Sequence, residues 1–85
     1  MHVEIVTTDE LLFQGEAEAV VAPAIDGDLG VLPGRQPVLA VLRPGTVRIT
    51  LPGGQQESHR VEAGFLSVDD DHVQVVVDNT VSSTN

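Results

Sequence analysis

The chain has 85 residues and no cysteine, and its 13 acidic residues face only 4 basic ones, a net charge of -9. This length predicts one domain with a small core, and the lack of cysteine excludes disulfides and thiolate metal sites. The acidic excess, with Phe13 and Phe65 as the only aromatic residues, argues against binding to nucleic acid or to an anionic membrane surface. No signal peptide or membrane span is predicted, so we expect a soluble chain that reaches a membrane only through partners.

Turn-forming residues recur along the whole chain, at intervals of about eight to twelve residues, between short valine-rich runs. This rhythm predicts an all-β fold, a small two-sheet β-sandwich or flattened barrel of about eight to ten short strands with no helix. The first alternating run is "EAEAVVA", where Glu16 and Glu18 are expected to point away from Ala17, Ala19 and Val21.

The stretch "IDGDLGVLPGRQPVL", residues 25–39, is the most punctuated part of the chain. Asp26 and Asp28 could ligate a cation, but the further acids and closing glutamate of a calcium loop are missing. The glycines at 27, 30 and 34 could form a phosphate loop, but no helix is predicted after them and the chain has no lysine. We therefore predict two successive glycine-built turns that hold out an acidic tip, with Arg35 placing a fixed positive charge beside Asp28.

The run "VLAVL", residues 38–42, is apolar on both faces of the predicted strand. Such a strand is covered on its second face either by its own domain or by a partner. The pattern alone leaves both alternatives open.

The second half of the chain alternates more regularly. In "TVRITL" the core face is predicted to hold Val47, Ile49 and Leu51, and in "HVQVVVD" it holds the valines at 73, 75 and 77, with Gln74 opposite. "LPGGQQ" predicts a hairpin turn before a strand at 57–61, and "DDD", residues 69–71, predicts a turn between strands at 64–68 and 72–78. The final "NTVSSTN" predicts a polar tail without packed structure.

The three histidines, His2, His59 and His72, are expected on three different strands and far apart. Ser58 and His59 are neighbours on one strand and therefore face opposite sides, which is wrong for a nucleophile and its base. We predict no catalytic residue, no metal, no cofactor and no small-molecule substrate. The pattern favours a binding or structural module over an enzyme.

Five motifs in order across the chain resemble one known family. They are "FQG" at 13–15, "DGDLGV" at 26–31, "PGRQP" at 33–37, "RPG" at 43–45 and "AGFLSV" at 63–68. Together they resemble the N-terminal β-sandwich domain of the epsilon subunit of the F-type rotary ATP synthase. The spacing is compatible over nearly the whole chain, and we expect residues 1–80 to form this domain and 81–85 the polar tail.

The resemblance implies a non-catalytic central-stalk subunit that links the gamma subunit to the membrane c-ring and couples proton transport to ATP synthesis. It implies a peripheral location on the cytoplasmic face of the bacterial inner membrane. The family's c-ring contact carries over to Asp26, Gly27, Asp28, Leu29, Gly30, Gly34 and Arg35. For the gamma contact we expect Val38, Leu39, Val41 and Leu42. The competing hypothesis is a free-standing β-sandwich that binds an ion or ligand.

The sequence departs from the family pattern in three ways. Arg35 stands where the family usually has histidine, so a titratable group is replaced by a permanent charge. Ala63 stands where a glycine is usual, which should matter little if its φ is negative. The family's C-terminal helical hairpin, which carries inhibition of ATP hydrolysis and in some members an ATP site, is not among these residues, and neither property is assigned to them.

Overall fold

The computed structural model of the protein describes residues 1–78, and the predicted tail at 79–85 lies outside the described residues. The described part contains nine β-strands and no helix, which confirms the predicted all-β fold. The strands are β1 (His2–Val6), β2 (Leu11–Glu16), β3 (Ala19–Ala24), β4 (Gly27–Val31), β5 (Val38–Leu42), β6 (Gly45–Thr50), β7 (Gln56–Val61), β8 (Gly64–Asp69) and β9 (His72–Val77).

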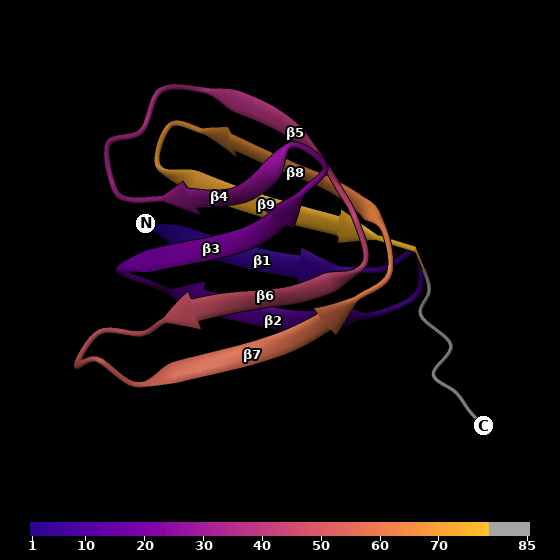
Figure 1. The fold of residues 1–85 in the computed structure, drawn as a ribbon. Helices are drawn as coiled ribbons and strands as arrows, with labels where there is room; N and C mark the ends of the chain where they lie inside the picture. The colour runs from indigo at the N-terminus through magenta and orange to yellow at the C-terminus, as the bar shows by residue number, and fades with distance from the viewer. Residues whose placement is uncertain (79–85) are drawn as a thin grey trace.

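The strands form two layers that join along one corner (Figure 1). One layer has the order β2-β1-β9-β8-β5, and the other has β4-β3-β6-β7. A single bridge between Ala24 and Leu42 connects β3 to β5 and makes the sheet continuous. Among the described strands, all pairings are antiparallel except that of β1 with β9, which lie side by side and parallel. The arrangement is the predicted β-sandwich, strongly curled.

The core lies between the layers and is built from small aliphatic side chains. Along β9, the valines at 73, 75 and 77 are buried while Gln74 is exposed, as the alternation predicts. Val47 and Ile49 of β6 are also buried. Because successive side chains on a strand point to opposite faces, the outer faces carry the other half of each strand.

One predicted alternation is wrong in phase. Residues 16–22 are not one strand, because β2 ends at Glu16 and β3 begins at Ala19. The break at Ala17 and Glu18 shifts the pattern, so Val20 and Ala22 are buried and Val21 is only half-buried. A turn of two residues inside an alternating run keeps the hydropathy pattern but changes which residues face the core.

The turn between β8 and β9 consists of Asp70 and Asp71, with φ of 52° and 63°. Two successive residues with positive φ are the requirement of a type I′ hairpin turn, and aspartate tolerates this region better than most residues. Ala63 is not among the described residues with positive φ, so the alanine at this family glycine position causes no backbone strain.

The loops gather at the two ends of the sandwich. The β3–β4 turn, Ile25 and Asp26, lies at one end of β4, and the β4–β5 loop, residues 32–37, lies at the other (Figure 1). We call these the hairpin end and the loop end. The loop end also holds the β8–β9 turn, because the Gly34 amide donates to Asp71 Oδ1 at 3.2 Å. A five-residue strand separates the two ends by roughly 16 Å.

Candidate partner-binding surfaces

An exposed line of apolar side chains crosses the outer face of the first layer. The register pairs Val41 with Phe65, Phe65 with Val76 and Val76 with Val6, so the four stand side by side on β5, β8, β9 and β1. Phe65 is 53% exposed, Val41 45% and Val76 39%. We call these four residues the apolar row. Contiguous exposed apolar side chains make this row a candidate contact surface for another molecule.

The strand β5 explains how "VLAVL" divides between core and surface. Its side chains alternate, with Val38, Ala40 and Leu42 toward the core and Leu39 and Val41 outward. Leu42 is 2% exposed and Leu39 is 72% exposed. The described part of the chain therefore leaves the second face of this strand uncovered. Of the four residues expected to contact gamma, Leu42 lies in the core, Val38 packs against the core, and Leu39 and Val41 are accessible, so the contact itself stays a prediction.

A groove of about 440 Å³ runs between the β3–β4 hairpin and β5. The expected c-ring residues Asp26 to Leu29 form one wall, and the expected gamma residues Val38, Leu39 and Val41 form the other. The Ile25 amide donates to the Val41 carbonyl at 3.0 Å and links the two walls of the groove. The structure thus brings together the larger parts of two residue sets that the sequence treated as separate.

The acidic tip of the hairpin is partly neutralised. Arg43 Nη2 donates to Asp28 Oδ1 at 3.1 Å, and Arg43 Nε donates to the Ala24 carbonyl at 3.1 Å. The ion-pair partner of Asp28 is therefore Arg43, and not Arg35 as the sequence suggested. Both side chains are about half exposed, so the pair contributes little to stability, on the order of 0.5 kcal/mol.

Gly34 and Arg35 lie in the β4–β5 loop at the loop end. Gly34 has a φ of 85°, which favours glycine, and its amide is held by Asp71. The Arg35 guanidinium donates to the Gly30 carbonyl at 3.4 Å. The expected c-ring residues are thus divided, with Asp26, Gly27 and Asp28 at the hairpin end and Gly34 and Arg35 at the loop end. They do not form the single acidic tip that the sequence predicted.

A second line of side chains crosses the same outer face nearer the loop end, and it is titratable. Its register runs Glu16, His2, His72, Asp69 across β2, β1, β9 and β8. We call these four residues the polar row. The His2 and His72 rings lie edge to face, with centroids 5.1 Å apart. The expectation that the histidines are far apart is therefore wrong for this pair.

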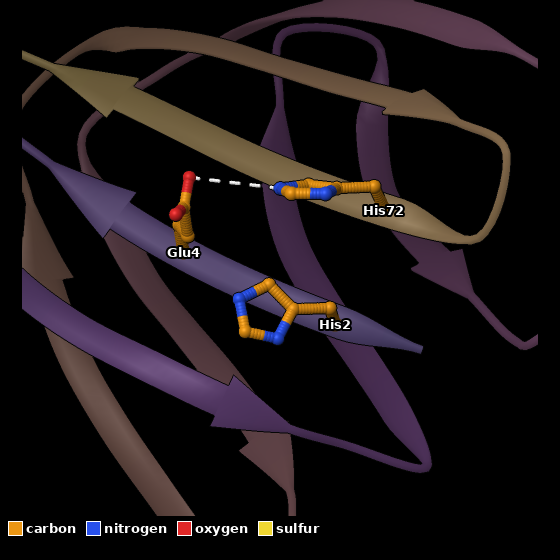
Figure 2. Close-up of side chains that lie close together, drawn as sticks. All are labelled: His2, Glu4 and His72. Carbon is orange, nitrogen blue, oxygen red and sulfur yellow. Dashed lines mark ion pairs between the residues drawn. The ribbon is translucent and has the colours of Figure 1, made fainter.

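Glu4, two residues after His2 on the same face, completes a cluster with the two histidines. Glu4 Oε1 lies 3.6 Å from His72 Nε2, and Figure 2 shows all three side chains converging from β1 and β9. Sequence reasoning missed this cluster because 70 residues separate its two strands. The spacing of His2 and Glu4 was the only local signal, and it becomes informative once β1 is paired with β9.

Within residues 1–78, no helix is long and apolar enough to cross a membrane.

The fold and its surfaces define a small β-sandwich with an exposed apolar row on one sheet face, and comparison with known proteins identifies its family. Residues 1–83 match the family model described as the β-sandwich domain of the ATP synthase delta/epsilon chain. The chain belongs to this family.

Two curated relatives are the ATP synthase epsilon chains of Neisseria meningitidis and Legionella pneumophila. The first is 39% identical over 84 residues, covering 98% of this chain and 60% of the relative. The second is 44% identical over 77 residues, covering 91% of this chain and 55% of the relative. The chain therefore spans little more than half the length of these relatives.

Solved structures with the same fold come from rotary ATP synthases. A chain of the Euglena gracilis mitochondrial ATP synthase, in a structure of OSCP, F1 and the c-ring, superposes with a TM-score of 0.83 at 25% identity, over 88% of this chain and 48% of that one. A chain in the central stalk and c-ring structure of the Tetrahymena thermophila enzyme gives a TM-score of 0.75 over 92% of this chain and 63% of that one. The latter, at 16% identity, supports the fold alone.

Proposed function

We propose that the chain is a rotor-stalk component of an F-type ATP synthase, linking the gamma subunit to the c-ring and coupling proton transport to ATP synthesis. The observation that carries the proposal is the exposed apolar row on a β-sandwich of the delta/epsilon family. Its role is mechanical and non-catalytic. As part of the complex it lies on the cytoplasmic face of a bacterial inner membrane, held there through its partners.

The gamma subunit is the proposed occupant of the apolar row and of the adjoining Leu39. Phe65 stands at the centre of this surface, between Val41 and Val76. A half-exposed aromatic flanked by aliphatic side chains is the kind of residue that contributes most to binding when a partner removes its remaining contact with water. The other residues of the apolar row, and Leu39, then serve mainly to exclude water from the contact.

The hairpin end is the proposed contact with the c-ring. Asp26, Gly27 and Asp28 are all exposed there, next to the groove that adjoins the apolar row. One partner on the sheet face and another at the adjacent end would place the domain at a corner between them, as a link in a rotor requires. Gly34 and Arg35, at the loop end, would then contact a different part of the assembly from Asp28.

A binding assay with a matched surface variant tests the gamma contact. The protein is titrated into an immobilised sub-complex that contains gamma and the c-ring. Phe65→Asp should weaken binding by at least about tenfold, since a charge would be buried at the centre of the interface. Leu32→Asp is the control, because Leu32 in the β4–β5 loop is 62% exposed and lies outside the apolar row.

Circular dichroism of both variants establishes that they remain folded. If Phe65→Asp and Leu32→Asp bind like the unmodified chain, the apolar row is not the gamma surface. If the unmodified chain itself fails to bind where a full-length epsilon chain does, the proposed function is wrong for this chain.

A further inference from the structure

The cluster of His2, Glu4 and His72 has the composition and placement of a metal site. His2 and Glu4 are two residues apart on β1 and so share its outer face, and His72 is the direct neighbour of His2 across the β1–β9 pair. One ligand atom from each side chain lies within 4.8 Å of the other two. In Figure 2 the two imidazoles and the carboxylate approach one another from adjacent strands.

Side chains next to this cluster form hydrogen bonds with His2 and Glu4, as residues around a metal site do with the metal ligands. Glu16 Oε2 lies 3.4 Å from His2 Nδ1, which leaves Nε2 of that ring available. Gln74 Nε2 donates to Glu4 Oε1 at 3.4 Å. A carboxylate on the second nitrogen of a ligating histidine fixes the ring orientation and raises its basicity. Strands β2, β1 and β9 thus contribute both the ligands and their supports.

The surroundings attract a cation and leave it a way in. A shallow depression of about 430 Å³ opens beside the cluster, lined by Glu4, Ser67, Asp69, Asp70, His72 and Gln74. Two of its carboxylates, on Asp69 and Asp70, add negative charge without belonging to the cluster. On a chain of net charge -9, such a concentration of acids raises the local concentration of cations.

We propose that His2, Glu4 and His72 bind a divalent transition-metal ion of the zinc class, with a fourth position left for water. Two imidazoles and one carboxylate suit zinc or cobalt, whereas magnesium and calcium prefer oxygen ligands alone. Metal–ligand distances of about 2.0–2.2 Å in a tetrahedral site require ligand atoms roughly 3.4 Å apart. To reach this value from the observed spread of 4.8 Å, the side chains would have to rotate, and all three are one-quarter to one-half exposed.

This site is independent of the proposed rotor function. The cluster lies in the loop-end half of the sheet. The apolar row crosses the same face further along, at Val6, two residues after Glu4 on β1, and at Val76, four residues after His72 on β9. A bound ion would connect β1 to β9, whose paired residues are 70 positions apart, at the point where their parallel pairing begins. The metal would therefore stabilise the pairing of β1 with β9 without occupying the proposed gamma surface.

Isothermal calorimetry with Zn²⁺ on the untagged 85-residue chain tests the proposal. We expect one ion per chain. When Co²⁺ replaces Zn²⁺, we expect the visible absorption bands that are characteristic of tetrahedral Co²⁺. His72→Gln and His2→Gln should each weaken Zn²⁺ binding at least about tenfold, because each removes one of three protein ligands. Mg²⁺ in large excess should not displace Co²⁺, because the site has two nitrogen ligands.

The chain offers a matched control in His59 and Glu57. These two residues of β7 also stand two positions apart, with His59 Nε2 3.3 Å from Glu57 Oε1. Within residues 1–78, however, no third histidine or carboxylate joins them to complete a set of three ligands. His59→Gln should therefore leave Zn²⁺ affinity unchanged within about twofold.

Three outcomes would overturn the proposal. They are a dissociation constant for the unmodified chain above about 1 mM, an equal loss of affinity in His59→Gln and His72→Gln, or displacement of Co²⁺ by Mg²⁺. Circular dichroism of each variant shows whether it is folded. Should a glutamine variant unfold, the Co²⁺ spectrum of the unmodified chain still decides whether nitrogen ligands hold the ion. None of these results bears on binding to gamma.

Discussion

The apolar row and the polar row occupy the same face of the same sheet, yet they present opposite chemistries. Val41, Phe65 and Val76 form an exposed apolar surface, whereas His2 and His72 lie close to carboxylates. Both rows rest on the same sheet and the same buried core. The difference shows that one rigid sheet can present two separate surfaces, provided that the strand register keeps each row intact.

The largest expected effect comes from breaking the framework that both rows share. A Cβ at Gly64 would overlap the Val76 carbonyl and lie 2.8 Å from Val77 Cα, both of them backbone atoms that cannot move aside. Gly64→Ala should therefore lower the free energy of unfolding by about 3 kcal/mol. Gly30→Ala is the control, because no atom lies within 4 Å of the place that its Cβ would take. Urea denaturation measures both, and equal stability of the two variants would contradict the close approach of β8 and β9.

Two leucines on neighbouring strands allow a core position to be compared with a surface position. Leu66 of β8 is fully buried, whereas Leu39 of β5 is 72% exposed. Leu66→Ala should cost about 3 kcal/mol of stability through lost burial and a residual cavity. Leu39→Ala should change stability by less than about 0.5 kcal/mol. Thermal unfolding compares the two, and a large loss for Leu39→Ala would mean that something within the chain covers it.

The two rows should respond differently to the proposed gamma partner. Val41→Thr combined with Phe65→Ser should weaken binding to the gamma-containing sub-complex by about tenfold or more, since the central contacts are lost. His2→Gln combined with His72→Gln should change it by less than about twofold, because charged or polar groups outside an interface contribute little. Surface plasmon resonance gives both values. Equal losses would merge the rows into one interface.

The smallest expected effect concerns the ion pair at the hairpin end. Asp28→Lys should lower stability by about 0.5–1 kcal/mol, because it removes an exposed ion pair and sets a like charge beside Arg43. The loss should shrink in high salt. Asp28→Arg with Arg43→Asp restores the pair with its charges exchanged and should recover the stability. Because Asp28 lies in the proposed c-ring contact, Asp28→Lys should also weaken c-ring binding. If this binding stays weak in the double variant, Asp28 contacts the partner directly; if it recovers, Asp28 acts only through Arg43.

The sequence predicted the parts of this molecule that depend on neighbouring residues. Alternation placed β6 and β9 correctly, and the "DDD" stretch became the β8–β9 turn. For the strand that is apolar on both faces, the sequence left the cover of the second face open, and only the structure shows that Leu39 and Val41 are exposed. Motif spacing identified the family, which the family model over residues 1–83 confirms.

The features that sequence reasoning missed depend on pairing between distant segments. His2 and His72 meet only because β1 and β9 are parallel neighbours, and no local pattern encodes that register. The Asp28–Arg43 pair likewise needs the β3–β4 hairpin to fold back on the β5–β6 turn. The glycines in residues 25–39 suggested two adjacent turns, so the strand between them, β4, was not predicted. This strand places Arg35 at the opposite end of the sandwich from the acidic tip.

Cross-linking from single cysteines can show which of the two rows faces gamma, because the chain contains no cysteine of its own. Val41→Cys on the apolar row and Asp69→Cys on the polar row would each carry the same photoreactive maleimide in the gamma- and c-ring-containing sub-complex. We expect a strong cross-link to gamma from position 41 and little or none from position 69. A cross-link to gamma from position 69 alone would show that gamma does not bind the apolar row.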